Sequence, residues 1–277
     1  MQQLPVNDDT RATRRTIHED KSLKDLPEFV TDREDNLGKF CGLLAFKAEG
    51  KLRTRVRDVL KELGNETMAQ RLERWEYGWG QGTLDKKKQV SAFFDVPGYG
   101  TFNSKDIPPC PQYNGSCMEH YACAERADLL RAVDLATMCK TNSMPRFMEL
   151  VKELAAVLTP LLDERRRSEG FNNRKKPVIV GRLIRHCDDT GIHRHVDCSC
   201  LAGPGIHGAI AVLKLSGSSI VTIYNKQDKT DKNDYTEMVR FSQCAGDVYV
   251  MYGDCRGCVH DPIYPDAGLF LVLRFYY

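Results

Sequence analysis

The second half of the chain reads as a succession of short strands. After Pro177, runs of β-branched and aromatic residues alternate with turn-forming stretches such as Ser216-Gly217-Ser218-Ser219, a pattern typical of antiparallel sheets. The strands predicted from it cover residues 178–185, 209–215, 220–225, 236–241, 248–252 and 269–276. Short strands of this kind bury their apolar faces against one another, so this half is expected to form a β-sandwich or barrel.

The first half is predicted to be mainly helical. Apolar residues spaced at i, i+4 and i+7 indicate an amphipathic helix within 46–63 that ends near Gly64. Further helices are predicted over 66–75, 124–140 and 145–168. Pro160 is expected to kink or divide the last of them, and residues 84–123 look irregular. Helices followed by strands predict an α+β fold in which the helices buttress the β core.

The charge pattern sets the expected domain boundaries. Residues 1–38 are rich in charge and poor in apolar periodicity, which indicates a flexible lead-in. Residues 39–277 are expected to form one domain, with a helical sheath over 39–176 and a β core over 177–277. A sheath is favoured over a separate domain because each predicted helix has a single apolar face that needs a sheet to cover it.

Composition and charge indicate the expected compartment and the expected partners of the protein. Forty Lys and Arg against 38 Asp and Glu give a net charge of +2, so the electrostatics of the whole molecule favour no particular partner. Eleven cysteines without an apolar leader favour reduced thiols and an intracellular protein. No apolar stretch is long enough for a membrane span, so no membrane association is expected. The oligomeric state is left open.

The residues that suggest a metal site are a His-x-Asp pair and a distant His. Side chains two apart in an extended strand share a face, so His195 and Asp197 can hold one metal from the same side. His260 follows later in the chain, again beside a strand-like run. Two imidazoles and one carboxylate are the ligand set of a non-haem Fe(II) oxygenase, which keeps metal positions open for cosubstrate and oxygen. The predicted metal ligands and catalytic centre are therefore His195, Asp197 and His260.

The order His195-x-Asp197, His260 and then Arg274 in the last strand resembles the Fe(II)/2-oxoglutarate dioxygenase superfamily over residues 177–277. The resemblance implies a double-stranded β-helix (jelly-roll) core, Fe(II) and 2-oxoglutarate as cofactors, and ascorbate as reductant. It also implies that Arg274 pairs with the distal carboxylate of 2-oxoglutarate, a role that suits a planar guanidinium. Arg185 is a secondary candidate for holding the cosubstrate. An ion pair inside the sheet is the alternative explanation for Arg185.

The segment from Gly246 to His260 is similar to the TET and base J-binding branch of that superfamily, with the AlkB-like branch as second choice. That similarity implies oxidation of a methylated base, of the 5-methylcytosine or N-methyl type, through a ferryl intermediate. The base would be flipped out of DNA or RNA, and a nuclear location would follow in a eukaryote. The basic stretch Arg165–Lys176 and the loop 226–234 are candidate phosphate contacts. A solvated helix end is the simpler interpretation of the basic stretch.

Other interpretations of the same residues stay open. The chain could be a protein or small-molecule hydroxylase of the same superfamily, or a non-catalytic jelly-roll module. A cupin-like site could use His193 with His195 and His260. Two cysteine groups could bind zinc, although buried free thiols are the default expectation: Cys110, Cys117, His120 and Cys123; and Cys198, Cys200, Cys255 and Cys258.

Overall fold

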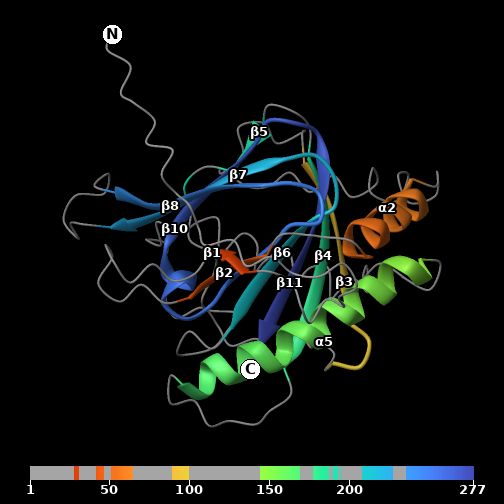
Figure 1. Ribbon diagram of the computed structural model, residues 1–277, viewed down its shortest axis with the longest axis horizontal. Coiled ribbons are helices and arrows are strands. Elements are labelled where there is room, and N and C mark those ends of the chain that lie inside the picture. The colour runs from red at the N-terminus through yellow and green to blue at the C-terminus, as the bar shows by residue number, and fades with distance from the viewer. Residues whose placement is uncertain are drawn as a thin grey trace, which may run out of the picture.

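Two antiparallel sheets face each other in the computed structural model, and two helices cover the outer face of the larger sheet (Figure 1). The structure describes residues 28–30, 42–46, 51–64, 89–99, 144–168, 177–186, 190–192, 194, 208–226 and 235–277. Within these residues the helices are α2 (Lys51–Leu63) and α5 (Pro145–Ser168), with a short 3-10 helix, η5 (Gly253–Gly257).

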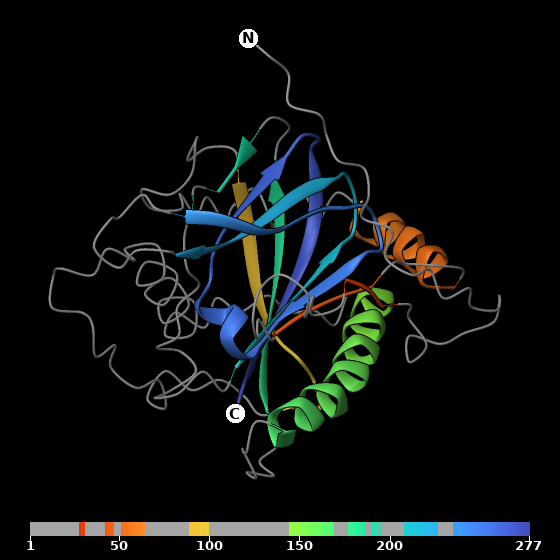
Figure 2. The ribbon, with the colours of Figure 1, turned by 60° about the vertical axis from the view of Figure 1, so that its left-hand side comes forward.

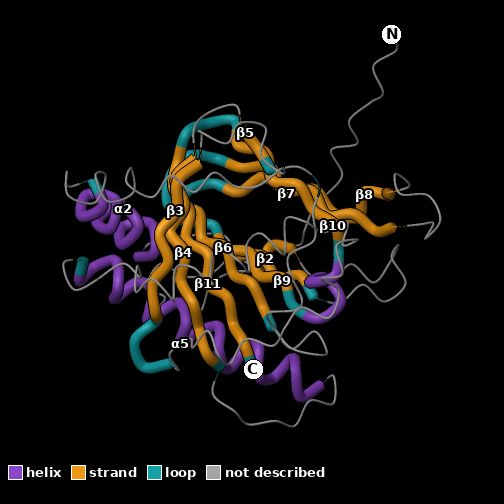
Figure 3. Tube along the Cα trace, turned by 180° about the vertical axis from the view of Figure 1, so that it is seen from behind, coloured by secondary structure: helices purple, strands orange, loops and turns teal. Residues whose placement is uncertain are grey.

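The larger sheet has seven strands in the order β1-β2-β9-β6-β11-β4-β3, and the smaller has four in the order β5-β10-β7-β8 (Figure 3). Those of the larger sheet are β1 (Glu28–Val30), β2 (Leu43–Phe46), β3 (Gln89–Asp95), β4 (Val178–His186), β6 (Ala209–Lys214), β9 (Val248–Met251) and β11 (Gly268–Tyr276). Those of the smaller sheet are β5 (Thr190–Gly191), β7 (Ser219–Lys226), β8 (Tyr235–Gln243) and β10 (Val259–Tyr264).

The path of the chain between the sheets identifies the fold. From β4 to β11 the chain crosses repeatedly from one sheet to the other, so strands close in sequence lie in opposite sheets. This is the connectivity of a double-stranded β-helix. The predicted α+β class with a jelly-roll core and buttressing helices is thereby confirmed.

Strand alternation divides the apolar residues into two cores. Along β11, Leu271, Leu273 and Phe275 belong to the core between the larger sheet and the helices, whereas Phe270 and Val272 belong to the core between the two sheets. The space between the sheets is called the barrel interior below. Both faces of the larger sheet are therefore buried, which accounts for the nearly continuous apolar sequence of β11.

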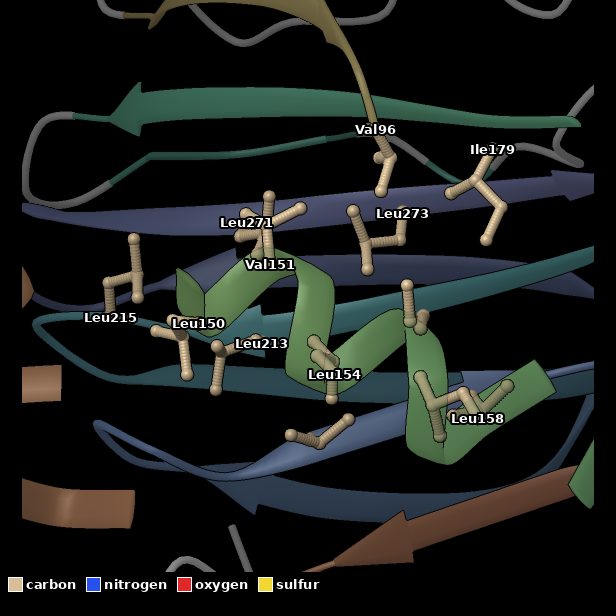
Figure 4. Close-up of a cluster of buried hydrophobic side chains, with 14 of the residues drawn as sticks. Val96, Leu150, Val151, Leu154, Leu158, Ile179, Leu213, Leu215, Leu271 and Leu273 are labelled. Carbon is tan, nitrogen blue, oxygen red and sulfur yellow. The ribbon is translucent and has the colours of Figure 1, made fainter. Parts of the chain in front are cut away.

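Helix α5 lies along the outer face of the larger sheet because one side of it is apolar. Val151, Leu154 and Leu158 recur at helical spacing and point towards Leu213, Leu271 and Leu273 of the sheet (Figure 4). Viewed from the side, α5 runs along the length of this sheet and α2 lies near one of its ends (Figure 2).

Glu62 of α2 fixes the start of α5. Its two carboxylate oxygens accept hydrogen bonds from the backbone N–H groups of Arg146 (3.1 Å) and Phe147 (2.7 Å). These are N–H groups that the first turn of a helix cannot satisfy internally, and the negative charge suits a helix N-terminus. Arg55 of α2 adds an ion pair with Glu153 of α5.

The structure differs from the sequence predictions in several elements. The helix predicted over 46–63 begins at Lys51, because 43–46 pairs with β9 as strand β2. Strand β3 lies inside the stretch predicted to be irregular. Helix α5 is not divided at Pro160, which lies on its exposed side, so water can satisfy the carbonyl that Pro160 leaves without an N–H partner. Strand β10 was missed because its sequence, VHDPIY, contains a proline.

Three strands come from residues that precede the predicted β core. Residues 28–30, within the predicted lead-in, form β1 and pair with β2. Strands β1, β2 and β3, all from the predicted helical sheath or before it, extend the larger sheet beyond 177–277. The helices predicted over 66–75 and 124–140 lie outside the described residues. Within the described ranges, no helix is both long and apolar enough to cross a membrane.

Candidate metal and cosubstrate site

His260 lies in the barrel interior, on β10 of the smaller sheet. It is opposite Ile223 of β7, which belongs to the interior core, and only 3% of its surface is exposed. Its Nδ1 atom is 3.3 Å from the backbone carbonyl oxygen of Cys258. A carbonyl oxygen only accepts hydrogen bonds, so Nδ1 is the donor in this contact. Histidine ligands of metals are commonly oriented by a backbone carbonyl in this way.

The segment that leads to His195 runs beside the strand that carries His260. Strand β5 pairs with β10 through Gly191 and Ile263, and the N–H of Ile192 donates to the carbonyl of Pro262 at 2.9 Å. Farther along, Nε of Arg194 lies 3.5 Å from Oδ2 of Asp261. The residue before His195 thus contacts the residue after His260. The side chains of His193, His195 and Asp197 themselves lie outside the described residues.

Arg274 also faces the barrel interior. It is opposite Val180 of β4 and Ile210 of β6, and Ile210 belongs to the interior core. Only 7% of its surface is exposed. Arg274 comes near the end of β11, and this strand runs back along the barrel from the turn that follows β10. His260, at the start of β10, and Arg274 therefore lie towards the same end of the interior.

The two arginines of β4, Arg182 and Arg185, face opposite sides of the larger sheet. Arg185 is opposite Leu269, which packs against the helix-facing core, so it lies on the outer face of the sheet. Arg182 is opposite Val272 of the interior core and is 1% exposed. Arg182 and Arg274 are diagonal neighbours on adjacent strands, at a typical separation of about 7–8 Å. The sequence prediction singled out Arg185 and missed Arg182, whose neighbourhood with Arg274 depends on strand pairing.

A second polar cluster lies at the opposite end of the interior. The Nζ atom of Lys214, which is 0% exposed, is 2.6 Å from Nε2 of His186. The His186 ring stacks on Tyr264 at 4.0 Å between centroids, and Lys214 lies over Tyr264 and Phe270. Burial lowers the pKa of the Lys214 amine to about 7. Lys214 was not assigned a role from the sequence.

Three basic side chains lie on the inward face of the larger sheet. Arg182, Arg274 and Lys214 are all buried there. Asp95 of β3 lies in the same row as Arg274, with Val180 between them. The inward face therefore carries both basic and acidic groups.

The predicted metal sites fall only partly within the described residues. Within them, no group of three His, Cys, Asp or Glu side chains is close enough to hold a metal ion, and two of the three predicted iron ligands fall outside them. Cys255 is buried in the interior core and Cys258 is half-buried. They are joined by a hydrogen bond from the N–H of Cys258 to the carbonyl of Cys255. The other cysteines named for zinc, and His120, also lie outside the described residues.

Comparisons with known proteins find likeness in structure only. No family model matches the sequence, and no curated protein matches it. OsALKBH1 overlaps 87% of this chain and 100% of its own, at 15% identity and a TM-score of 0.43. YcfD, a ribosomal oxygenase from Escherichia coli, overlaps 36% of this chain and 23% of its own, at 10% identity and a TM-score of 0.26. An oxalate oxidase overlaps 35% of this chain and 41% of its own, at 17% identity and a TM-score of 0.24. The fold assignment rests on the strand order rather than on these overlaps.

Proposed function

We propose that the protein is an Fe(II)- and 2-oxoglutarate-dependent dioxygenase with His195, Asp197 and His260 as metal ligands. One observation carries the proposal: the segment that ends at Arg194 is paired with the strand of His260, so residues far apart in sequence enter one region from adjacent strands. The buried, inward-facing His260 with its proton on Nδ1 suits a metal ligand.

Two arginines of the interior, Arg274 and Arg182, support the proposed binding of 2-oxoglutarate. Arg274 lies towards the same end as His260 and would pair with the distal carboxylate of 2-oxoglutarate. Arg182, diagonal to it, would add positive charge to the same region. When bound, Fe(II) and 2-oxoglutarate would supply oxygen activation. The contributions of the chain are orientation of the imidazoles, binding of the carboxylate and exclusion of water by the apolar interior core. Arg185, on the outer face, is not included in this site.

The reaction is tested by conversion of 2-oxoglutarate to succinate. Purified protein with Fe(II) and ascorbate is expected to form succinate, slowly without substrate and faster with it. His260→Ala is expected to abolish this and to lower the metal content, whereas Arg185→Ala serves as the matched control. If the wild-type protein forms no succinate under either condition, and His195→Ala leaves the metal content unchanged, the proposal is wrong.

We propose a methylated base in DNA or RNA as the substrate. Two observations favour it: the similarity of the Gly246 to His260 segment to base-modifying branches of the superfamily, and the exposed Arg165 and Arg167 at the end of α5. Arg166, between them, is buried against the ring of Tyr277, 3.7 Å from its centroid. The rest of the basic stretch, 169–176, and nearly all of the loop 226–234 lie outside the described residues.

The substrate is tested by mass spectrometry of nucleosides after incubation with methylated DNA and with methylated RNA. The expected product is an oxidised base from a C-methylated base, or the demethylated base and formaldehyde from an N-methylated base, and neither should form with His260→Ala. If succinate forms on a protein or small molecule and neither product is found, the nucleic-acid substrate is wrong and the dioxygenase proposal stands.

A further inference from the structure

A four-residue cluster on the outside of the smaller sheet joins the two segments that carry the proposed histidine ligands. The guanidinium of Arg194 lies over the ring of Tyr224, 4.3 Å from its centroid, and 5.8 Å from that of Tyr235. Nε of Arg194 is 3.5 Å from Oδ2 of Asp261, and the hydroxyl of Tyr224 donates to the same oxygen at 2.9 Å. We call this cluster the clip.

The clip and the proposed metal site lie on opposite faces of one strand. Successive residues of a strand point to opposite sides, so His260 faces the barrel interior and Asp261 faces outwards, opposite Thr222 of β7. The clip therefore has no direct contact with the interior. Its contacts join the residue before His195 to the residue after His260.

The clip has more contacts than an isolated surface ion pair. Arg194 is 49% exposed and Asp261 17% exposed, and a simple pair with that exposure contributes little because water screens it. Here the Asp261 carboxylate binds two donors, and the guanidinium also stacks on an aromatic ring. Tyr224 is buried, and its ring meets that of Tyr235 edge-on at 6.4 Å. Each component holds another in position.

We propose that the clip is a positioning device that fixes the separation of His195 and His260 before the metal binds. This inference rests on the proposed function. A preorganised pair of imidazoles loses less conformational freedom on metal binding than two independent segments would. Residues that orient metal ligands typically contribute about 10–100-fold to metal affinity. The clip residues are positioning residues, because none of them would touch the metal.

The test measures metal affinity separately from activity. Co(II) is titrated into the metal-free full-length protein, and thermal unfolding of the metal-free protein is recorded for each variant. Arg194→Met keeps the aliphatic stem but removes the charge. Tyr224→Phe removes only the hydroxyl and is the milder change. We expect the Co(II) dissociation constant to rise about tenfold for Arg194→Met and less for Tyr224→Phe.

Two further variants separate positioning from general stability. Arg240→Met removes an exposed arginine from β8, the neighbouring strand, opposite Thr222 and on the same outer face. It is expected to leave the dissociation constant unchanged. Arg194→Asp combined with Asp261→Arg restores an ion pair in the opposite sense and is expected to recover part of the affinity that Arg194→Met loses.

The outcomes distinguish this inference from the proposed function. If wild-type protein and His260→Ala bind Co(II) equally or not at all, the proposed metal site is wrong and the clip has no ligands to position. If wild-type protein binds Co(II) and His260→Ala does not, but the clip variants bind as tightly as wild type, the clip alone is overturned. An equal loss of affinity in Arg240→Met, or a loss that only follows a lower melting temperature, overturns it as well.

Discussion

Tyr264 and Phe270 stack on each other, with ring centroids 5.5 Å apart and an interplanar angle of 24°. Tyr264 ends β10 and Phe270 lies near the start of β11, so the pair closes one end of the barrel interior. His260 precedes Tyr264 by four residues, and Arg274 follows Phe270 by four. At about 3.3 Å per strand residue, each lies about 13 Å along its strand from the stacked pair. The stacked pair therefore lies at the Lys214 and His186 end, away from His260 and Arg274.

Replacement of Arg274 should weaken cosubstrate binding without affecting the metal. A charged hydrogen-bonded pair contributes about 1.5–3 kcal/mol, so Arg274→Ala is expected to raise the dissociation constant of 2-oxoglutarate by about 10–100-fold. Calorimetry in the presence of Co(II) measures it, and the Co(II) affinity itself should stay constant. Arg185→Ala, on the outer face of β4, should have no effect. Equal weakening by both variants would remove Arg274 from the cosubstrate site.

The buried lysine should make stability depend on pH in the alkaline range. Burial lowers the pKa of Lys214 from 10.5 to about 7, and Asp266 and Cys244 oppose part of that shift. Between pH 7 and 10.5 the unfolded chain therefore binds a proton that the folded protein does not. From this group, the free energy of unfolding rises with pH by up to about 1.4 kcal/mol per unit. Below pH 7 both states are protonated, and the cost of burying the charge is fully present.

Urea unfolding of wild-type protein and Lys214→Met at pH 7, 8 and 9 measures this contribution. Methionine has a similar shape and no charge, so the variant lacks the rise that comes from Lys214. The stability of wild type relative to the variant should therefore increase with pH. Parallel pH profiles would show that the Lys214 amine keeps its proton in the folded protein, held by His186 at 2.6 Å.

Loss of the Glu62 carboxylate should destabilise the junction of the two helices. Glu62→Ala removes two hydrogen bonds to the first turn of α5, and loss of a helix cap costs about 0.5–2 kcal/mol. Chemical unfolding gives the difference. Lys61→Ala, at the neighbouring exposed position, should change stability by less than about 0.5 kcal/mol. Equal effects of the two substitutions would show that the cap contributes nothing measurable.

Gly181 should not tolerate a side chain. A Cβ atom at this position would overlap the ring of Phe94 on β3, which is buried and packs edge-on against Phe147 of α5 at 5.3 Å. Overpacking of a core costs about 1–3 kcal/mol, so Gly181→Ala should lower the free energy of unfolding by this amount. Phe94→Leu makes room, and the double variant should be more stable than the sum of the two single effects predicts. Strict additivity would show that the ring is not the obstacle.

Local patterns in the sequence predicted most of the strands of the β core. Runs of β-branched and aromatic residues located β4, β6, β7, β8, β9 and β11 to within a few residues, because most of these strands bury at least one face. The missed strands lack that signal. Strand β5 has two residues, β10 contains Pro262, and β3 lies in a stretch crowded by turn residues. They are strands because they exchange hydrogen bonds with their neighbours in the sheets, and those neighbours are distant in sequence.

The sequence by itself determined which residues share a face of their own strand. Alternation in β4 separates Arg182 from Arg185, and alternation in β10 separates His260 from Asp261, whatever the fold. Only the tertiary structure decided which of these faces is the barrel interior and what lies across from it. Register with β11 placed Arg182 beside Arg274, and pairing with β5 brought Arg194 to Asp261. Strand pairing is a relation between distant segments, so it is fixed when the two sheets close on a common core.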